Sequence, residues 1–327
     1  LLALGEKDIL LYRSHRSTLP DDEVAGLPVE TDLQAALAHR PEAVIVSNPT
    51  ALHLDVAIPA AQAGCAILLE KPVSHSLEQV DAFRMAVRQG GARVLVGYQF
   101  RFHPTLRRAA ALLAEGVIGQ PQAVRAHWGE YLPDWHPWED FRQGYAARAD
   151  LGGGVILTLC HPFDYLRMLL GEIDVVSAMA GYGAGLDLPV EETAEIGLRF
   201  ASGVVGSVHL NYIQRPPDHH LEIIGSEGTL RWNAADGALE VYQAGPRSET
   251  GPGWQTELPP QSFERNTLFL DEMRNFLAVA HGQAQPACTL EDGIRALEIA
   301  LLARRSAAEP PRNGQPPGQA GLDNGLR

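Results

Sequence analysis

Two short stretches of the sequence combine residue types that can hold or move a proton. The tripeptide Glu70-Lys71-Pro72 follows directly on four apolar residues, so two opposite charges stand at the end of a predicted buried strand. The second stretch contains His161 and Asp164, whose spacing puts both side chains on one face of a helix. Because an imidazole titrates near neutral pH, His161 is a candidate catalytic base, and Asp164 is predicted to fix its tautomer.

Each of these residues also has a purely structural explanation. A single lysine such as Lys71 is usually a solvated surface charge. His161 can be an ordinary helix-start residue, since Pro162 follows at a position where proline is favoured. Asp164 can cap that helix or pair with Arg167, three residues ahead. The sequence leaves these alternatives open.

The first hundred residues alternate between short apolar runs and helical patterns. The helix over 31–40 is predicted to open with a capping box made by Thr31 and Gln34. Apolar strands alternating with helices predict a Rossmann-like α/β fold, a doubly wound parallel sheet with right-handed crossovers. Strands are expected at 8–13, 43–47, 66–70 and 93–97, and helices at 31–40, 53–64 and 76–90.

Polar residues gather where these predicted strands end. In a parallel doubly wound sheet, ligands bind beyond the carboxyl ends of the strands. We therefore expect the charges of Glu70 and Lys71 to belong to a ligand-binding mouth. The other polar groups at strand ends are Arg13, Arg16, Asn48, Pro49, Thr50, Tyr98 and Gln99.

The glycine-rich phosphate loop of a dinucleotide fold is absent from the sequence. Residues 1–14 have the pattern of a helix end followed by the second strand. We expect the first strand and its G-x-G-x-x-G turn about 20 to 30 residues upstream of Leu1, from the length of a βαβ unit. Without that turn the chain is expected to bind its cofactor poorly.

After residue 100 the pattern changes to period-two strands with glycine turns, which predicts an α+β domain with a mostly antiparallel open sheet. Residues 226–228 are predicted to close a hairpin. The Gly- and Pro-rich tail over 310–327 is expected to be disordered. Strands are expected at 122–131, 173–182, 192–200, 203–214, 219–225, 228–233 and 238–243, and helices at 104–115, 157–170, 266–281 and 290–307.

Composition limits the function classes. Lys and Arg total 26 against 40 Asp and Glu, so the net charge of −14 disfavours nucleic acid and anionic membrane partners. No apolar run reaches the roughly 20 residues that span a bilayer. Cys65, Cys160 and Cys288 lack disulfide or zinc spacing and lie in apolar stretches, and no metal site is expected, which favours a reducing cytoplasm.

Several motifs in order resemble the Gfo/Idh/MocA oxidoreductases. They are "NPTALHLDVAIPAAQAG", "EKP", "GYQFRFHP", "GGGVILTLCHPFDYLRMLLG" and "IIGSEGTL", and the resemblance covers roughly residues 1–307. It implies a Rossmann domain over 1–100, incomplete at its N-terminus, and a substrate-binding and dimerisation domain over 101–309. It also implies NAD(P)-dependent oxidation of sugar or cyclitol hydroxyls, or reduction of the ketones, and a homo-oligomer formed through the outer face of the open sheet.

Hydride leaves a carbinol carbon only when the hydroxyl proton is accepted, a role that suits His161. The resemblance places Lys71 beside a positively charged nicotinamide, where its pKa is expected to fall and its amino group to hydrogen-bond the reacting oxygen. It also suggests a cis bond before Pro72 and a contact between Glu70 and the nicotinamide ribose.

The remaining site predictions concern cofactor and substrate. The family places the segment with Asn48, Pro49, Thr50 and His53, and the strand end at Gln99, along the cofactor. Basic and hydroxyl groups after the second strand, where NAD-specific domains carry an acid, favour NADP over NAD; these are Arg13, Ser14 and Arg16. The candidate substrate contacts are Arg101, His103, Trp135, Trp138 and Tyr145.

One departure from the family pattern leaves the activity open. The family commonly has an acidic residue three or four positions before the histidine, where this chain has Thr158 and Leu157. Two alternatives to a dehydrogenase therefore remain. One is a non-catalytic protein that senses NAD(P), and the other is a lyase or glycosidase that oxidises its substrate transiently.

Overall fold

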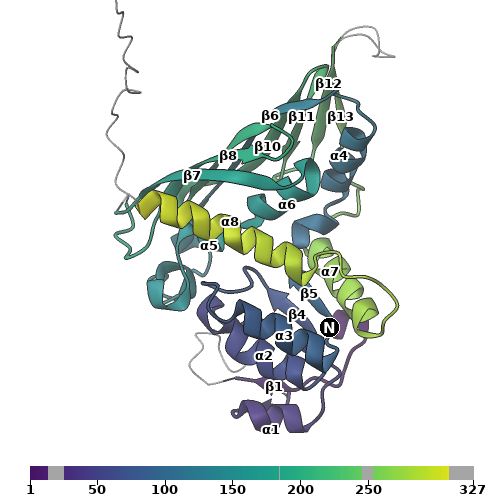
Figure 1. Cartoon of the computed structure of the whole chain (residues 1–327), viewed down its shortest axis with the longest axis vertical. Helices are drawn as coiled ribbons and strands as arrows, with labels where there is room; N and C mark the ends of the chain where they lie inside the picture. The colour runs from purple at the N-terminus through teal and green to yellow at the C-terminus, as the bar shows by residue number, and fades with distance from the viewer. Residues whose placement is uncertain (14–25, 184, 245–252, 309–327) are drawn as a thin grey trace, which may run out of the picture.

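The computed structural model describes residues 1–13, 26–183, 185–244 and 253–308. Strands near the N-terminus form a small parallel layer, and later strands form a large twisted sheet at the other end of the molecule (Figure 1). The predicted order, a Rossmann-like parallel sheet followed by a mostly antiparallel sheet, is confirmed. The predicted tail over 310–327 lies outside the described residues.

The parallel part contains two ladders. Strands β3, β4 and β5 pair in that order, and β1 pairs with β2 separately. The run 66–70 forms a strand because its apolar residues are buried on both faces, as a strand covered by helices requires. The elements are η1 (Leu2–Leu4), β1 (Leu11–Tyr12), β2 (Val29–Glu30), α1 (Leu33–Ala38), β3 (Ala43–Val46), η3 (Thr50–Leu52), α2 (His53–Gln62), β4 (Ala66–Glu70), α3 (Val80–Gly90) and β5 (Val94–Gly97).

Four details of this part differ from the predictions. The strand expected over 8–13 is limited to two residues, and β2 was not predicted. Helix α1 is capped by Asp32, whose Oδ1 accepts a hydrogen bond from Ala35 N at 2.8 Å, and not by a box from Thr31. Helix α3 begins four residues late, because the Ser76 hydroxyl accepts from Glu78 N and stabilises a local turn instead.

The large sheet has the strand order β13-β12-β11-β10-β6-β9-β8-β7. Every pairing is antiparallel except that between β6 and β9. The predicted hairpin at 226–228 joins β10 and β11. Its strands are β6 (Pro121–Tyr131), β7 (Ile173–Gly181), β8 (Thr193–Phe200), β9 (Val205–Asn211), β10 (Ile213–Gly225), β11 (Gly228–Asn233), β12 (Leu239–Gln243) and β13 (Gly253–Glu257).

Two elements of the second half differ from the predictions. Strand β13 was missed because Trp254 is its only large apolar residue and the strand is mostly exposed, so that it shows no apolar alternation. The helix expected over 157–170 is broken at Leu159 and Cys160 into two helices. The helices are η4 (Gln99–Phe102), α4 (Pro104–Ala114), α5 (Val155–Thr158), α6 (His161–Leu170), α7 (Arg265–Ala280) and α8 (Leu290–Ala308).

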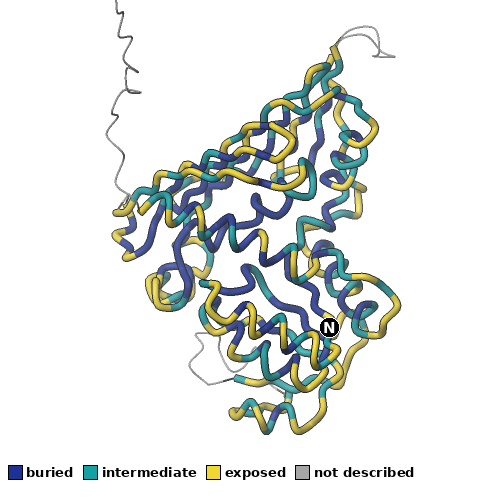
Figure 2. Tube along the Cα trace, viewed as in Figure 1, coloured by how far each residue is buried: buried dark blue, intermediate teal, exposed yellow. Residues whose placement is uncertain are grey.

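Helices cover one face of the large sheet only. On β6 the residues Val124, Ala126 and Trp128 point to that face and are buried, whereas Arg125 points away and is exposed. Figure 2 shows the buried chain concentrated between this sheet and the parallel layer. Among the described residues no helix covers the opposite face (Figure 1).

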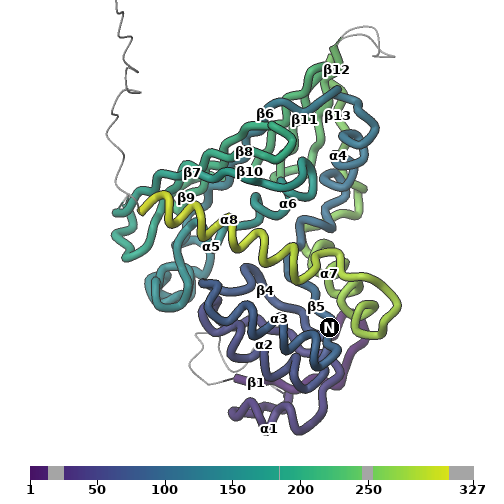
Figure 3. The backbone as a smooth tube through the Cα atoms, viewed as in Figure 1, coloured from purple at the N-terminus to yellow at the C-terminus, as the bar shows by residue number. Residues whose placement is uncertain are grey.

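The last helix joins the two sheets. Helix α8 contacts β7, α5 and α6 on one side and β5 on the other, and its course between the layers can be followed in Figure 3. Gly293 permits the close approach, because a Cβ there would lie 2.8 Å from Val96 and 2.9 Å from Val73. The three cysteines are unpaired and buried. In the described part of the chain, no helix combines the length and apolarity needed to cross a membrane.

Candidate active site

Lys71 reaches from the parallel layer into the second half of the chain. It follows β4, and the Lys71-Pro72 bond is cis, as predicted. Its Nζ donates a hydrogen bond of 2.7 Å to the carbonyl oxygen of Thr158, the last residue of α5. The ammonium therefore lies at the junction of α5 and α6, three residues before His161.

The junction offers this carbonyl because of the proline that follows. In a continuous helix the oxygen of Thr158 would accept from the N–H of residue 162, but Pro162 has none. The helix breaks at Leu159, whose φ and ψ are −95° and 36°, and α6 begins at His161. A carbonyl left without a helical partner is thus free to bind Lys71.

His161 is held by aromatic rings and not by a polar partner. Its ring meets Tyr98 and Phe100 edge to face, with centroids 5.5 and 5.1 Å away, and Trp128 lies 5.2 Å away at a tilt. Its Nδ1 is buried and has no hydrogen-bond partner among the described residues. The packing fixes the plane of the imidazole while leaving its proton exchangeable with a ligand.

At pH 7 the imidazole of His161 is neutral, whereas the amino group of Lys71 is charged. Burial lowers the pKa of His161 well below 6.5, and the positive charge of Lys71 lowers it further, so the imidazole is neutral at pH 7. Burial also lowers the pKa of Lys71, but Tyr145, Cys160, Glu70 and Glu130 outweigh that effect, and the net pKa is raised above 10.5. The predicted lowering is therefore not found in the chain alone; it stays a prediction for the complex with a positively charged nicotinamide.

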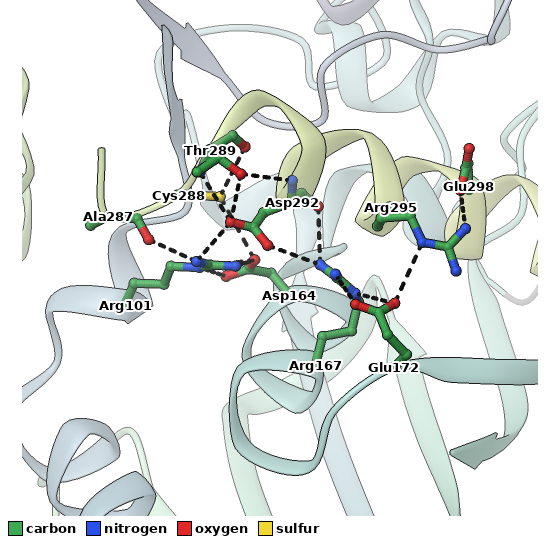
Figure 4. A network of polar contacts seen from close by, with 10 residues as sticks. All are labelled: Arg101, Asp164, Arg167, Glu172, Ala287, Cys288, Thr289, Asp292, Arg295 and Glu298. Carbon is green, nitrogen blue, oxygen red and sulfur yellow. Dashed lines mark hydrogen bonds and ion pairs between the residues drawn. The ribbon is translucent and has the colours of Figure 1, made fainter. Parts of the chain in front are cut away.

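Asp164 does not orient His161, so that prediction is wrong. Its carboxylate accepts from Arg101, with Nη2 to Oδ1 at 2.6 Å and Nε to the two oxygens at 3.0 and 2.9 Å. Burial raises the pKa of Asp164, and the Arg101 guanidinium opposes the rise. Arg101 also donates to the carbonyl of Ala287 and to Asp292, at 2.7 and 3.3 Å, as Figure 4 shows. The contact of Arg101 with substrate stays a prediction; in the chain itself the guanidinium is bound by Asp164, Ala287 and Asp292.

The wider network in Figure 4 ties α6 to α8. Arg167 pairs with Glu172 and, at 3.6 Å, with Asp292, and the pairing of Asp164 with Arg167 that the sequence allowed does not form as a direct ion pair. Asp292 in turn accepts from the backbone and hydroxyl of Thr289 at the start of α8. The network therefore locks together the helix that carries His161, η4 and α8.

Among the predicted cofactor residues, His53 has a structural place. It is buried, and its ring nitrogens lie 2.9 and 3.0 Å from the carbonyl oxygens of Pro72 and Asn48. Burial lowers the pKa of His53 to about 4, so it is neutral. The ring joins the loops after β3 and β4, and its direct contact with cofactor stays a prediction. Thr50 is also buried, beneath Gly152 of the facing segment.

Other predicted cofactor residues lie at the expected edge of the sheet. Asn48 donates to the carbonyl of Leu52, while its Oδ1 is buried without a partner among the described residues. Pro49 precedes η3, Gln99 begins η4 and is half-buried, and Arg13 directly follows β1. Ser14 and Arg16 lie outside the described residues.

Glu70 and Asn48 fit a cofactor that carries hydroxyl and amide groups. A Cβ at Gly97 would lie 3.2 Å from Oε2 of Glu70, so a larger residue would push this carboxylate aside by a few tenths of an ångström. Burial raises the pKa of Glu70, while Lys71 lowers it. Carboxylate and orphaned amide oxygens at the ends of adjacent strands are acceptors for ribose hydroxyls or a carboxamide.

The predicted substrate residues separate into three environments. His103 is a buried residue, packed edge to face against Trp232 at 5.1 Å and hydrogen-bonded to Thr105, and its substrate contact stays a prediction. Trp138 is 65% exposed, whereas Trp135 packs on Tyr212 and its buried Nε1 has no partner among the described residues. Tyr145 lies close enough to Lys71 for each to shift the pKa of the other.

Tyr98, one of the residues expected at the strand ends, is fully buried; its hydroxyl lies 3.4 Å from Sγ of Cys160, and its ring packs against His161. Sequence reasoning missed two contributors. The carbonyl of Thr158 could have been found from the proline four residues on. Glu272 is buried on α7 between Leu268 and Phe276, and an acid in an otherwise apolar helical stripe is the signal that would have identified it.

Comparisons with known proteins agree with this arrangement. The family model described as "Oxidoreductase family, NAD-binding Rossmann fold" matches residues 9–98, and the model of the GFO/IDH/MocA C-terminal domain matches residues 106–231. The chain is 29% identical to 1,5-anhydro-D-fructose reductase of Ensifer adhaerens, over 82% of this chain and 78% of the relative. It is 28% identical to the scyllo-inositol 2-dehydrogenase (NAD(+)) of Bacillus subtilis, over 84% and 77%.

A solved structure shares the fold. Levoglucosan dehydrogenase in complex with NADH and levoglucosan superposes with a TM-score of 0.79 at 23% identity, over 91% of this chain and 88% of that one. At this identity the likeness shows the fold alone. The two family models together span most of the chain, from the parallel layer into the large sheet. The chain belongs to the Gfo/Idh/MocA family of oxidoreductases.

Proposed function

We propose that this oxidoreductase transfers a hydride between a nicotinamide cofactor and a hydroxyl or keto group of a sugar, sugar derivative or cyclitol. The observation that carries the proposal is the meeting of Lys71 and His161 at the junction of α5 and α6. The relatives named for anhydrofructose, inositol and levoglucosan support the substrate class.

The two side chains divide the proton chemistry. The cofactor supplies or accepts the hydride at the reacting carbon. In the oxidation direction the neutral imidazole of His161 accepts the hydroxyl proton, and in reduction the imidazolium returns it. Lys71 has three N–H donors and uses one for Thr158, so two remain to hold the reacting oxygen.

The cofactor contacts are assigned to the strand ends. Glu70 accepts from a ribose hydroxyl, and Asn48 offers its unpaired Oδ1. The family description and the relatives support NAD(H) as the cofactor class. A preference for NADP rests on Arg13 and on Ser14 and Arg16 beside it, and it is part of the proposal.

The open sheet face supports self-association. Its outer side carries Val175, Met179, Val205 and Trp254, all exposed, with Met179 at 74%. Exposed apolar groups on an uncovered sheet are typical of an interface, and we assign this face to a homo-oligomer. The three unpaired, buried cysteines fit a cytoplasmic enzyme, and the acidic net charge gives no surface for nucleic acid.

The test follows absorbance at the nicotinamide band with a panel of polyols, sugars and keto-sugars, using NADH and NADPH in parallel. His161→Ala and Lys71→Ala should each lower kcat by about 100-fold or more, as loss of a positioned acid or base does. The exposed His39→Ala and Lys7→Ala serve as matched controls. Full activity in the two site variants would reject these roles.

A cofactor-sensing protein without turnover is the second candidate. The observation in its favour is that Nδ1 of His161 has no polar partner in the described part of the chain, and that Thr158 stands where the family commonly has an acid. Tight binding of NADH or NADPH without turnover across the whole panel would select it. Net substrate cleavage without net cofactor reduction would instead select a lyase or glycosidase.

A further inference from the structure

Glu272 is a buried carboxyl that the proposed chemistry does not use. It lies in the middle of α7, and the side chain is only 3% exposed. The buried face of α7 is otherwise apolar, formed by Leu268, Phe276 and Val279 at helical spacing. A carboxyl in this row costs stability unless something compensates its burial.

No compensating hydrogen bond exists within the described part of the protein. Oε1 of Glu272 is buried and without a partner, and no ion pair is formed by the side chain among residues 1–13, 26–183, 185–244 and 253–308. Buried polar groups are nearly always satisfied, so an unpaired one points to a partner that arrives with a ligand or to a functional charge state.

The position of α7 brings this carboxyl to the cofactor edge. The helix contacts β4, β5 and η4, the elements whose ends carry Glu70, Gly97 and Gln99. The negative charge of Glu70 acts on Glu272. Two buried carboxyl groups, of which one acts electrostatically on the other, cannot both be ionised at little cost, so one of them more readily keeps its proton.

The environment decides which one keeps it. Burial, together with the smaller effect of the Glu70 charge, raises the pKa of Glu272 to about 8. Burial raises the pKa of Glu70 as well, but the charge of Lys71 and its backbone N–H, 3.4 Å from Oε2, oppose that rise. No described cation opposes the rise at Glu272, so Glu272 is the member of the pair that keeps its proton more readily.

We propose that Glu272 is a positioning residue for Glu70: its protonated carboxyl leaves Glu70 as the single anion that accepts a ligand hydroxyl, and its ionisation at alkaline pH weakens that ligand. The inference rests on the proposed function, because the ligand is a vicinal diol. Both the ribose of a nicotinamide dinucleotide and a polyol substrate carry that group.

Other charged groups near α7 do not titrate in the same range. From β4 the neighbours are Glu70 and Lys71, the latter with a pKa raised above 10.5. From η4 the neighbour is Arg101, bound to Asp164 and Asp292, with a raised pKa. On α7 itself Arg265 is exposed and Arg274 pairs with Asp271 at 2.6 Å. His161 has a lowered pKa, and those of Tyr98, Tyr145 and Cys160 are raised.

The direction in which pH changes ligand affinity follows from the protonation of Glu272. A group with a pKa of about 8 is nine-tenths protonated at pH 7 and one-tenth protonated at pH 9. If the diol binds only while Glu272 is protonated, the affinity for the diol falls about tenfold between pH 7 and pH 9, because the raised pKa of Glu272 lies between these two values. Glutamine keeps the shape of the side chain and cannot ionise, so Glu272→Gln should remove the fall.

The experiment measures the dissociation constant of NADH by fluorescence from pH 6.5 to 9.5, and the KM of the best substrate over the same range. The proteins are wild type, Glu272→Gln, Glu70→Gln and the exposed control Glu78→Gln, each checked for folding by circular dichroism. We expect the wild type and Glu78→Gln to lose NADH affinity about tenfold from pH 7 to 9 and Glu272→Gln to stay level. A fall confined to substrate KM would assign the diol to the substrate.

Equal slopes in wild type and Glu272→Gln, for both NADH and substrate, would overturn the inference. If Glu272→Gln does not fold, Glu70→Gln decides, since removing the anion must also abolish the slope. No NADH binding by the wild type at any pH would refute the proposed cofactor function itself. If the wild type binds NADH and Glu272→Gln shows the same pH dependence of binding, only the role of Glu272 is refuted. The two failures are therefore distinguishable.

Discussion

The variant Asp164→Asn tests whether the Asp164 carboxylate serves catalysis or stability. The substitution keeps the size of the side chain and removes its charge, leaving Arg101 buried opposite an amide. Asp164 is 1% exposed and receives three hydrogen-bond contacts from the guanidinium. If Asp164 served His161, activity would fall with stability unchanged; if it serves Arg101, stability falls first.

The size of the loss follows from the buried pair. Removing one partner of a buried ion pair typically costs about 3 to 5 kcal/mol; here Arg101 would lose its closest counter-ion and keep only the longer contact with Asp292, at 3.3 Å. At an unfolding entropy of about 2.1 cal/mol/K per residue, a chain of 327 residues loses about 1.5 °C in Tm for each kcal/mol. We therefore expect Tm to fall by about 4 to 7 °C.

The double variant Arg101→Met with Asp164→Leu tests the same reasoning by removing both charges of the pair. Replacing both charges with apolar side chains leaves no unpaired ion at that pair, so it should recover at least half of the loss. Glu291→Gln is the matched control, since it breaks an exposed pair with Arg84 and should cost about 1 kcal/mol or less. Tm is read by differential scanning calorimetry.

A kinetic measurement can refute the structural role of Asp164. Below its Tm, Asp164→Asn should retain kcat within about threefold, because the His161 imidazole does not depend on this carboxylate for its tautomer. A variant with wild-type Tm and a kcat reduced a hundredfold or more would restore the orienting role and refute the structural one.

Two further predictions concern the sheet and the cofactor edge. Val205→Glu, on the outer face of β9, should shift the protein toward monomer in light-scattering chromatography. The control Met85→Glu, on α3, should not. Equal behaviour of the two variants would contradict an interface on this sheet face. Gly97→Ala should weaken NADH binding about tenfold by displacing the Glu70 carboxylate, whereas Gly253→Ala, with open space around it, should leave binding unchanged; unaltered binding in both would exclude this steric role.

Local rules account for the elements that the sequence predicted. The run 66–70 is apolar on both faces, and the strand and the following Glu-Lys-Pro turn were placed without tertiary information. Strand β13 is mostly exposed and has one large apolar residue, Trp254; it exists because β12 offers an edge to pair with, which no periodicity reveals. Propensity therefore identifies the buried strands and misses those formed by pairing alone.

The partners of charged side chains depend on the fold and not on spacing. Asp164 was assigned to His161 from a helical spacing of three, but its partner Arg101 lies 63 positions away and on another element. Helical spacing gives proximity along one face, while a buried carboxylate pairs with whichever cation the packing brings to it. The burial of His103 and His53 shows the same limit, since it is not visible from their neighbours in the chain.

The convergence of Lys71 and His161 nevertheless has a cause that the sequence contains. Pro162 removes the N–H that would bond the carbonyl of Thr158, so the chain must break its helix at this point and leave an acceptor unsatisfied. A buried ammonium needs an acceptor as much as that carbonyl needs a donor, and the two satisfy each other at 2.7 Å. The proline that starts the helix of His161 thereby also fixes Lys71, which explains how residues ninety positions apart come to share one site.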